Sequence, residues 1–550
     1  MAPRPRTLHD VPSPIRDLTD RVFDELLASE PHLRARAGLP IERLKVPSLE
    51  ARQEDVRFAR SVLADLDAAP VESDEDRLNA GFLRHLMGGV VSRGEHDDLG
   101  FGVTPYQTWG LKVSLGYAFQ GFAGSDATYA DLTADYRDTV RELRVRLLRQ
   151  RELGILVPRA ALPGVRESLD RMRASSRAVL TASAPTGLAD SSLIDEVDAE
   201  FGLLDDALGD DYAAAAPQEA CLSRYPGGES YYRFLVKDLT SSDLTPEQLH
   251  ETGLQQCAEL AERMAEVRSQ LGFTGSEQEF HAMLATDPRV HARDHEEVNA
   301  LFRRHMAALE PRIGDWFAVL PQAPYDVERL DPALEAGMTY GFYEAPTATQ
   351  PTGYYRWNGV DLENKSLLTY AALIFHELAP GHHFHLARQA ENTDLPPLRR
   401  EPLLGAFNEG WAEYASGLGW EMGLYDDPLD AYGRLTHERF TAQRLVVDTG
   451  LNLMGWSLEQ AASFMSANTT ESDAQVASEV LRYSTDLPAQ ALGYRAGYLE
   501  LMRLRARAEK SWGERFDVRD FHELVLGPGA LPFPVIEESV DRVARSVPTD

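Results

Sequence analysis

The chain has 550 residues, of which 43% are hydrophobic and 26% charged, a composition typical of a soluble globular protein rather than a disordered one. It carries 55 Lys and Arg against 87 Asp and Glu, a formal net charge of −32 at pH 7. Because nucleic acids and anionic lipids are bound largely through Lys and Arg, this balance argues against a nucleic acid or a membrane as partner.

Cysteine content and the N-terminal segment bear on location. Only Cys221 and Cys257 are present, too few for a disulfide framework or a cysteine metal site. Residues 1–18 contain basic side chains but no apolar signal-peptide core, and no uninterrupted apolar run reaches about eighteen residues. We therefore expect a cytoplasmic protein, and the sequence leaves its oligomeric state open.

The first 320 residues show mainly helical periodicity. Thr245-Pro246-Glu247-Gln248 is a capping box with proline at the first helical position, which predicts a helix from there to about Leu271. The aromatic- and glycine-rich stretch 101–122 suits a loop or short extended segment packed on the helices. Apolar residues recur at three- and four-residue spacing in segments 17–30, 51–66, 75–89 and 136–154.

Strand character is confined to residues 321–360. Segments 324–330, 338–343 and 352–360 carry Val, Tyr, Phe and Thr between Pro and Gly breakers. A small β-sheet is therefore expected just before the chain reaches His376, an arrangement similar to the edge strand that holds extended substrate in thermolysin-like peptidases. From residue 401 to the end the periodicity is helical again, and no repeat or linker divides the chain. We expect one large, mainly α unit over residues 1–550.

The segment HELAPGHHFH, from His376 to His385, predicts a metal site. The familiar zinc signature is H-E-x-x-H, in which two histidines at i and i+4 share one face of a helix. Here Pro380 and Gly381 lengthen the spacing. If they form a bulge that absorbs two residues, His382 takes the place of the second histidine. In an undisturbed helix His383 returns to the same face, but about 10.5 Å further along the axis. We favour His382, and His383 is the alternative.

The remaining parts of a catalytic metal site follow from neighbouring carboxylates. Glu377, next to the first ligand, is the expected general base. In the downstream segment FNEGWAEYA, Glu409 and Glu413 stand at i and i+4 and therefore share a helix face. Glu409 is the expected third ligand, and Glu413 is placed to orient a histidine ligand from behind. One zinc ion is expected, although manganese, cobalt or iron also suit His and Glu ligands.

These motifs resemble those of a bacterial family catalogued as domain of unknown function 885, whose marks are H-E-x-x-P-G-H-H and a following E-G-W-x-x-Y. The resemblance extends over nearly the whole chain and includes residues 444–461 and 482–497. It implies a helical fold similar to the carboxypeptidase Taq group of gluzincin metallopeptidases, with a deep cleft over zinc. Residues 1–320 then form one cleft wall and residues 321–550 the metal-binding catalytic part. The same resemblance implies His376, His382 and Glu409 as ligands and Glu377 as base.

Two positions depart from the family pattern. Asn452 stands where the family commonly has histidine, and His385 stands where it commonly has glutamine. If either residue contacts substrate, the specificity of this protein differs from that of its relatives.

Peptide hydrolysis also needs a donor for the negative charge that develops on the carbonyl oxygen. Tyr494 in ALGYRAG is the leading candidate, with Tyr354 or Tyr355 as the alternative. Arg482 and Arg495, with Tyr355, are candidates for binding substrate, because arginine holds a carboxylate bidentately. Arg444 is a further candidate, although its i, i+4 spacing to Asp448 favours a structural ion pair.

The sequence thus predicts a zinc-dependent peptidase that hydrolyses short peptides in the manner of a carboxypeptidase or an oligopeptidase, through a metal-activated water. One alternative is a metal-dependent amidase or tailoring hydrolase that acts on a small amide-containing metabolite. Another is a non-catalytic binding protein that retains the fold. Glu377 argues against the last, because a structural zinc needs no base and is usually closed by four protein ligands.

Overall fold

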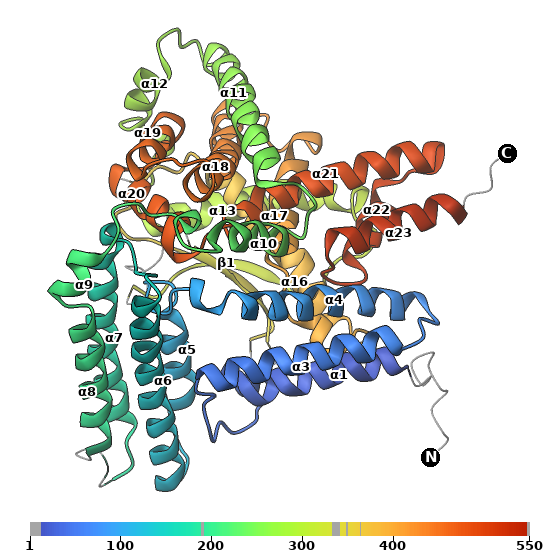
Figure 1. Ribbon diagram of the computed structural model, residues 1–550. Helices are drawn as coiled ribbons and strands as arrows, with labels where there is room; N and C mark the ends of the chain where they lie inside the picture. The colour runs from blue at the N-terminus through green and yellow to red at the C-terminus, as the bar shows by residue number, and fades with distance from the viewer. Residues whose placement is uncertain are drawn as a thin grey trace. The chain divides into compact units, whose positions relative to one another are not determined.

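The computed structural model describes residues 13–186, 188, 192–332, 341–347, 350–362 and 365–546 (Figure 1). Two parts of the sequence discussed above lie outside the described residues. They are residues 338–340 of one predicted strand and residues 1–12 of the N-terminal segment. The chain divides into two compact units. Unit 1 comprises Met1–Leu235, Gly450–Ala462 and Ala477–Pro488, and unit 2 comprises Val236–Thr449, Ser463–Val476 and Ala489–Asp550. The division near residue 320 expected from the sequence stays a prediction.

The expected fold class is confirmed, because the protein is mainly helical with one small three-stranded sheet. Unit 1 is built from antiparallel and side-by-side helices, with α3 against α4 and α6 against α8 as the most extensive pairs (Figure 1). Its helices are α1 (Pro14–Ser29), α2 (Pro31–Arg36), α3 (Leu49–Ala68), α4 (Asp74–Glu95), α5 (Trp109–Phe119), α6 (Asp126–Glu152), α7 (Leu162–Ser183), α8 (Ser192–Ala207) and α9 (Asp210–Ala215).

One expectation for unit 1 is wrong. Residues 109–119, predicted as loop or extended segment, form helix α5, which packs against α2, α6 and α7. Glycines and aromatic residues are poor helix formers by themselves, but burial of an apolar helix against three neighbours outweighs that weak local preference. The aromatic residues of this stretch signal burial, and they do not signal the type of secondary structure.

Unit 2 holds most of the remaining helices. Its first long helix, α11 (Pro246–Gln270), begins at the predicted capping box, in which Thr245 and Gln248 exchange side-chain-to-backbone hydrogen bonds. The others are α12 (Glu277–Leu284), α13 (His295–Leu309), α15 (Tyr370–Glu377), α16 (His382–Glu391), α17 (Gly405–Glu421), α21 (Leu492–Trp512), α22 (Val518–Leu526) and α23 (Phe533–Ser546). The chain crosses between the units inside α10 (Gly228–Thr240), α18 (Pro428–Asn452), α19 (Leu458–Asn468) and α20 (Asp473–Leu481).

The predicted sheet is present in unit 2, with the strand order β1-β3-β2. Strands β1 (Tyr325–Arg329) and β3 (Gly353–Trp357) are parallel, whereas β2 (Gly341–Glu344) runs antiparallel to β3 and aligns Tyr343 with Tyr355. Among the described strands β2 therefore lies at an edge. One face of the sheet is buried, since Tyr355 and Trp357 of β3 are enclosed and Tyr355 packs against Phe302 of α13.

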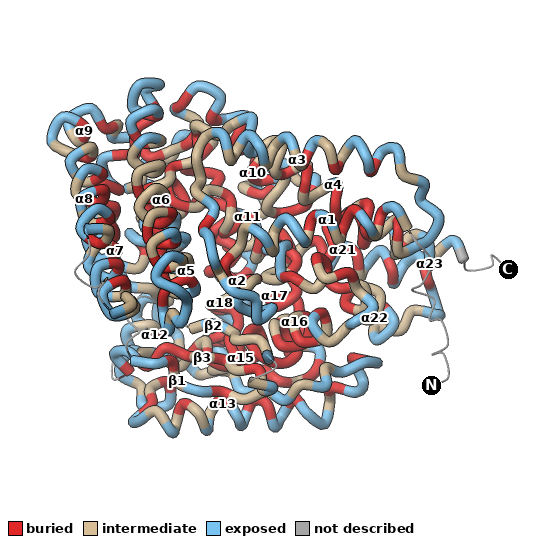
Figure 2. The backbone as a smooth tube through the Cα atoms, turned by 90° about the horizontal axis from the view of Figure 1, so that it is seen from below, coloured by how far each residue is buried: buried red, intermediate tan, exposed pale blue. Residues whose placement is uncertain are grey.

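Helix α17 lies at the centre of unit 2. All residues of α15 are buried, as are most residues of α17, and both appear largely in the colour for buried residues in Figure 2. Helices α17 and α21 make the most extensive contact of any pair of elements. Two glycines allow it, because a Cβ atom at Gly410 would lie 2.5 Å from the Cα atom of Gly497, and one at Gly497 would collide with the Ala406 carbonyl. Helix α17, which carries Glu409, therefore packs with its backbone directly against the backbone of α21.

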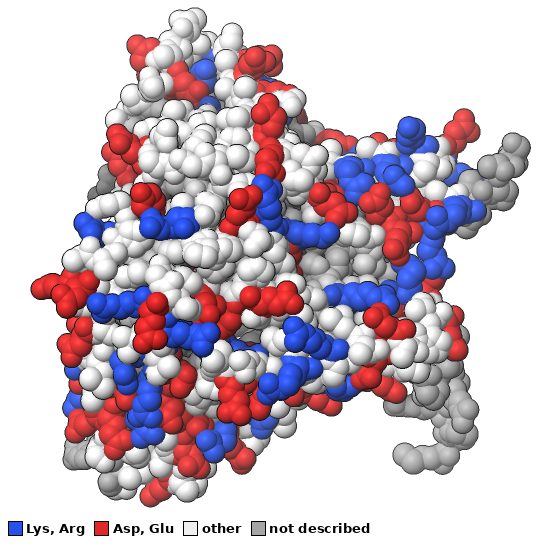
Figure 3. All heavy atoms as spheres, in the orientation of Figure 1, with Lys and Arg blue, Asp and Glu red and all other residues white. Residues whose placement is uncertain are grey.

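Opposite charges are intermixed on the face of the molecule shown in Figure 3, where acidic and basic side chains alternate over the helices. Many of them are paired, as in the ion pairs of Arg141 and Arg144 with Glu200. No helix within the described ranges is long and apolar enough to cross a membrane.

Substitution of Gly410 by alanine is expected to lower the thermal midpoint of the protein, because the added methyl group forces α17 away from α21. Overpacking of this kind costs about 1–3 kcal/mol. Gly405→Ala is the matched control, since a Cβ at Gly405 on the same helix meets no atom within 4 Å. Differential scanning fluorimetry of both variants checks the prediction, and equal midpoints would contradict the close crossing.

Candidate metal centre

The helix that begins at Tyr370 stops immediately after Glu377. Residues 378–381 separate it from α16, which begins at His382, so the expected bulge is a break between two helices. Gly381 is required at this point, because any Cβ atom there would collide with the carbonyl oxygen of His376. The break turns the chain so that the rings of His376 and His382 lie against each other at nearly right angles, with their centroids 4.8 Å apart.

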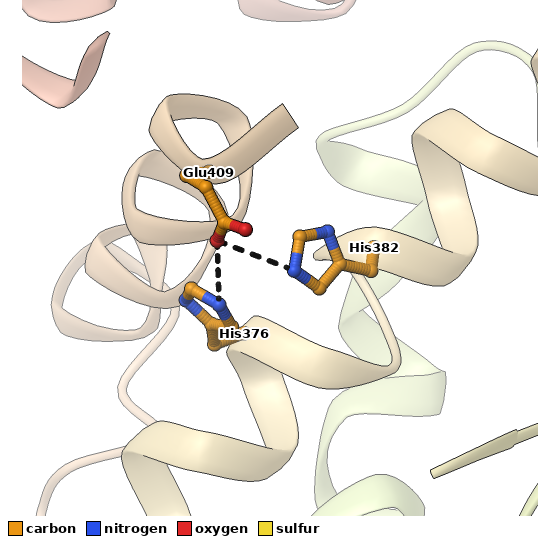
Figure 4. Close-up of side chains that lie close together, drawn as sticks. All are labelled: His376, His382 and Glu409. Carbon is orange, nitrogen blue, oxygen red and sulfur yellow. Dashed lines mark ion pairs between the residues drawn. The ribbon is translucent and has the colours of Figure 1, made fainter. Parts of the chain in front are cut away.

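Three side chains predicted as ligands converge from three helices. Oε2 of Glu409, from α17, lies 3.5 Å from Nε2 of His376 and 3.6 Å from Nε2 of His382 (Figure 4). These three atoms all lie within 4.8 Å of one another. The spacing is suited to one ion at their centre.

Glu413 determines which nitrogen of His376 faces this centre. Its carboxylate is fully buried, with Oε1 lying 3.0 Å from Nδ1 of His376 and 2.6 Å from Nε2 of His437, and Oε2 3.2 Å from Nη1 of Arg434. The contact with Nδ1 of His376 lacks hydrogen-bond geometry, but the negative charge of Glu413 beside this nitrogen favours a proton on it. Nε2 is then the nitrogen on the side of Glu409, and its lone pair becomes available to a metal ion that displaces its proton, the arrangement in which a carboxylate behind a histidine orients it for a metal.

His382 is oriented by a second histidine in a similar way. Its Nδ1 atom lies 3.0 Å from Nε2 of His385, which is buried and whose Nδ1 has no hydrogen-bond partner. Burial holds the pKa of His385 well below its usual value, so this ring is neutral. In the tautomer in which Nε2 of the neutral His385 accepts from Nδ1 of His382, the Nε2 lone pair of His382 faces Glu409. His385, singled out in the sequence as a departure, therefore contacts a predicted ligand.

His383, the alternative ligand, is occupied elsewhere. Its Nε2 lies 3.0 Å from the carbonyl oxygen of Ala323, which can only accept, so Nε2 donates. Its Nδ1 then accepts from the Tyr343 hydroxyl at 2.8 Å. Burial lowers the pKa of His383 to about 4, which keeps the ring neutral. Both nitrogens are engaged away from Glu409, so the structure brings His382 and not His383 to the cluster.

The electrostatics of the cluster favour a cation. Burial by itself lowers the pKa of His376, but Glu409 and Glu413 outweigh burial and raise it to about 10. Burial raises the pKa of Glu409, yet His376 and His382 hold it well below its usual value. The cluster thus stabilises additional positive charge at its centre. Two imidazole lone pairs and a carboxylate oxygen are ligands that zinc accepts, so the residues present fit the expected ion.

The predicted base lies beside this centre. Glu377 is 8% exposed, and burial raises the pKa of its carboxyl group, while His376 and His382 partly offset the rise. The backbone N–H of Tyr343, on edge strand β2, lies near this carboxylate and slightly lowers its pKa, the smallest of these effects. A base whose pKa is raised toward the operating pH can both take up and return a proton.

The other predicted site residues lie in different environments. The ring of Tyr494 is nearly parallel to that of His376, with centroids 6.4 Å apart, and the Arg444 guanidinium lies 4.8 Å from the Tyr494 ring centre. Tyr355 is buried in the sheet, where burial and Glu377 raise its pKa. Arg495 is buried as well, donates to Gln256 at 2.5 Å and lies 3.9 Å from Glu438.

Arg482 belongs to unit 1, whereas the cluster belongs to unit 2. It lies 3.5 Å from Glu479 and over the ring of Tyr106, both in the same unit. Asn452, the second departure from the family pattern, is also in unit 1, where it joins the backbones of Leu222 and Tyr483. Substrate contact by Arg482 stays a prediction.

Sequence reasoning did not identify His437 and Arg434, although both contact Glu413. They lie on α18 with Glu438, which lies 3.1 Å from Arg434. The spacing i, i+3, i+4 in RLTHE places the three residues on one helix face, and this pattern in the sequence indicates a cluster of polar side chains there. Which carboxylate that face meets depends on tertiary packing.

Comparisons with known proteins agree with this fold. The chain matches the family described as "Bacterial protein of unknown function (DUF885)" over residues 31–540, so the family recognised from the motifs is confirmed. The structure titled "putative lipoprotein from Colwellia psychrerythraea" is similar with a TM-score of 0.82 and 23% identity, covering 98% of this chain and 100% of that one. A "putative lipoprotein of unknown function from Shewanella oneidensis" has a TM-score of 0.74 and 17% identity, covering 95% and 99%. No curated protein matches the chain.

Replacement of His382 by alanine is expected to abolish stoichiometric zinc binding, because it removes one of three converging ligand atoms. His383→Ala is the matched control, and it should retain zinc, since the nitrogens of His383 bind Ala323 and Tyr343. We expect affinity to fall by more than the 10- to 100-fold that is typical of losing an outer partner. Metal analysis after equilibrium dialysis checks this, and zinc loss in His383→Ala alone would overturn the ligand assignment.

Proposed function

The chain belongs to the bacterial family of unknown function that its residues 31–540 match, and we propose that it is a zinc-dependent hydrolase that cleaves peptide bonds in short peptides. The observation that carries the proposal is the convergence of His376, His382 and Glu409 beside the buried carboxylate of Glu377. A zinc ion held there supplies a Lewis acid toward a water molecule and a substrate carbonyl.

Glu377 is the proposed general base. It takes a proton from the attacking water and passes it to the amine that leaves when the C–N bond breaks. Burial raises its pKa, and the Tyr343 N–H lies beside the carboxylate, so the base is enclosed by protein groups. A histidine or carboxylate ligand alone does not require such a neighbour, which favours catalysis over a structural role.

Edge strand β2 is proposed to hold the substrate backbone. The N–H of Tyr343 points to Glu377, and the carbonyl of a strand residue lies on the same side as its N–H. This edge, which no other described strand pairs, therefore offers a hydrogen-bond acceptor next to the base. An extended peptide can add to such an edge as a further strand, which is a recurring mode of peptide recognition.

Tyr494 is the proposed donor to the developing oxyanion. It comes from α21, on the side of His376, and the Arg444 guanidinium lies against its ring. A cation near a phenol makes the hydroxyl a stronger hydrogen-bond donor, because it stabilises negative charge on the oxygen. Stabilisation of this kind typically contributes a few kcal/mol to the barrier.

A metal-dependent amidase that acts on a small metabolite would use the same groups, so it is the second candidate. The edge of β2 beside the base, which is not paired by another strand within the described ranges, favours a peptide, because a small amide has no extended backbone to pair with it. Hydrolysis of a short-peptide library, compared with a panel of small amides, separates the two candidates.

Glu377→Gln is expected to lower the rate of peptide hydrolysis by at least about 100-fold while the protein retains its zinc, since it removes only the base. Glu262→Gln on the exposed face of α11 is the control for loss of one carboxylate. Hydrolysis of a fluorogenic peptide and metal content are measured on the same samples. Full activity in Glu377→Gln with zinc bound would exclude the assigned mechanism.

Tyr494→Phe is expected to lower kcat by about 10- to 100-fold with KM little changed, because the hydroxyl donates mainly in the transition state. Tyr498→Phe, one turn further along α21 and stacked on Arg495, is the matched control. Steady-state kinetics with the same peptide checks this. Equal kcat in both variants would remove Tyr494 from the mechanism.

A further inference from the structure

The two adjacent histidines His382 and His383 serve different structures. His382 faces Glu409, whereas His383 connects α16 to two strands of the sheet. Its Nε2 donates to the carbonyl of Ala323, two residues before β1, and its Nδ1 accepts from the hydroxyl of Tyr343 in β2. Ala323 is itself fixed to α16, because its N–H donates to Glu391 at 2.9 Å.

His383 spans the sheet at one particular point. Strand β3 lies between β1 and β2, and it begins at Gly353. A Cβ atom at Gly353 would lie 2.6 Å from the Tyr343 hydroxyl oxygen and 2.8 Å from Nδ1 of His383. The hydrogen bond between Tyr343 and His383 therefore passes directly over the first residue of β3, and only glycine leaves room for it.

We propose that His383 and Tyr343 form a clamp that positions the base Glu377. The clamp is the path from the His383 ring, through the Tyr343 hydroxyl, to the Tyr343 backbone N–H that lies beside Glu377. His383 is a positioning residue, since it touches neither Glu377 nor the three ligand atoms. This inference rests on the proposed function for its catalytic consequence, but the clamp itself is a property of the fold.

The geometry explains why the clamp acts on the base. Tyr343 is on the edge strand, so among the described strands β3 is its one neighbour within the sheet. Its side chain is hydrogen-bonded to α16 and its backbone N–H lies beside Glu377 at the end of α15, on either side of the break at residues 378–381. Loss of the hydroxyl removes the hydrogen bond to α16, and the N–H beside Glu377 is then held less closely. A displacement of about 1 Å at a reacting group can lower a rate by about 100-fold.

Tyr343→Phe tests the clamp, because it removes one hydroxyl and keeps the ring. We expect kcat for peptide hydrolysis to fall by about 10-fold or more, with KM changed less than about threefold and zinc retained. Gly353→Ala should have the same effect, since its methyl group displaces the same hydrogen bond. Tyr325→Phe is the matched control, because Tyr325 of β1 also packs on the His383 ring, with centroids 4.9 Å apart, but its hydroxyl takes no part in the clamp, and this variant should keep full activity.

A second measurement does not depend on activity. Hydrogen–deuterium exchange of residues 341–347 should be at least about tenfold faster in Tyr343→Phe and His383→Ala than in the wild type, and unchanged in Tyr325→Phe. The double variant Tyr343→Phe/His383→Ala should exchange no faster than His383→Ala alone, because the two residues form one connection.

The outcomes separate the two hypotheses. A wild-type protein that hydrolyses no peptide refutes the proposed function, and the exchange measurement still decides on the clamp. Unchanged exchange in Tyr343→Phe refutes the clamp. Faster exchange with unaltered kcat refutes its role in positioning the base.

Discussion

The candidate centre depends on one buried carboxylate. Glu413 has no exposed side-chain surface, and its two oxygens lie against His376, His437 and Arg434. Removing one partner from such a buried set typically costs about 3–5 kcal/mol, because a charge is left without compensation. The charge of Glu413 also favours a proton on Nδ1 of His376, so a purely structural group helps to determine that Nε2 is the nitrogen facing Glu409. Glu413 therefore contributes both to the stability of the fold and to the orientation of His376, a proposed metal ligand.

Helix α17 connects the candidate centre to other helices of unit 2. It carries Glu409 and Glu413 on one face, and on another it meets α21 at Gly410 and Gly497. Further along, the Tyr414 hydroxyl contacts His522 of α22, whose other nitrogen donates to the Trp316 carbonyl. Because α21 also carries Tyr494, the close crossing of the two helices fixes the distance between the proposed oxyanion donor and the ligands.

Features of the fold that depend on residues close together in the sequence could be predicted from the sequence. The capping box at Thr245, the helical class, the small sheet and the shared face of Glu409 and Glu413 all follow from spacing within a few residues. His437 and the partners of His383 could not be predicted this way, because they depend on which helix or strand packs nearby. The choice between His382 and His383 was open for the same reason. Helix α5 was missed because tertiary burial outweighs the weak helix preference of its residues.

The break at residues 378–381 has a consequence beyond the choice of histidine. In the short signature both histidines belong to one helix, so an ion bound there bridges two points that the backbone already holds together. Here the three ligand atoms come from the end of α15, the start of α16 and the body of α17. The proposed cation would be a tertiary cross-link between three separate helices. Its binding free energy would contribute to folding, and the resistance of unit 2 to unfolding would then depend on the free metal concentration.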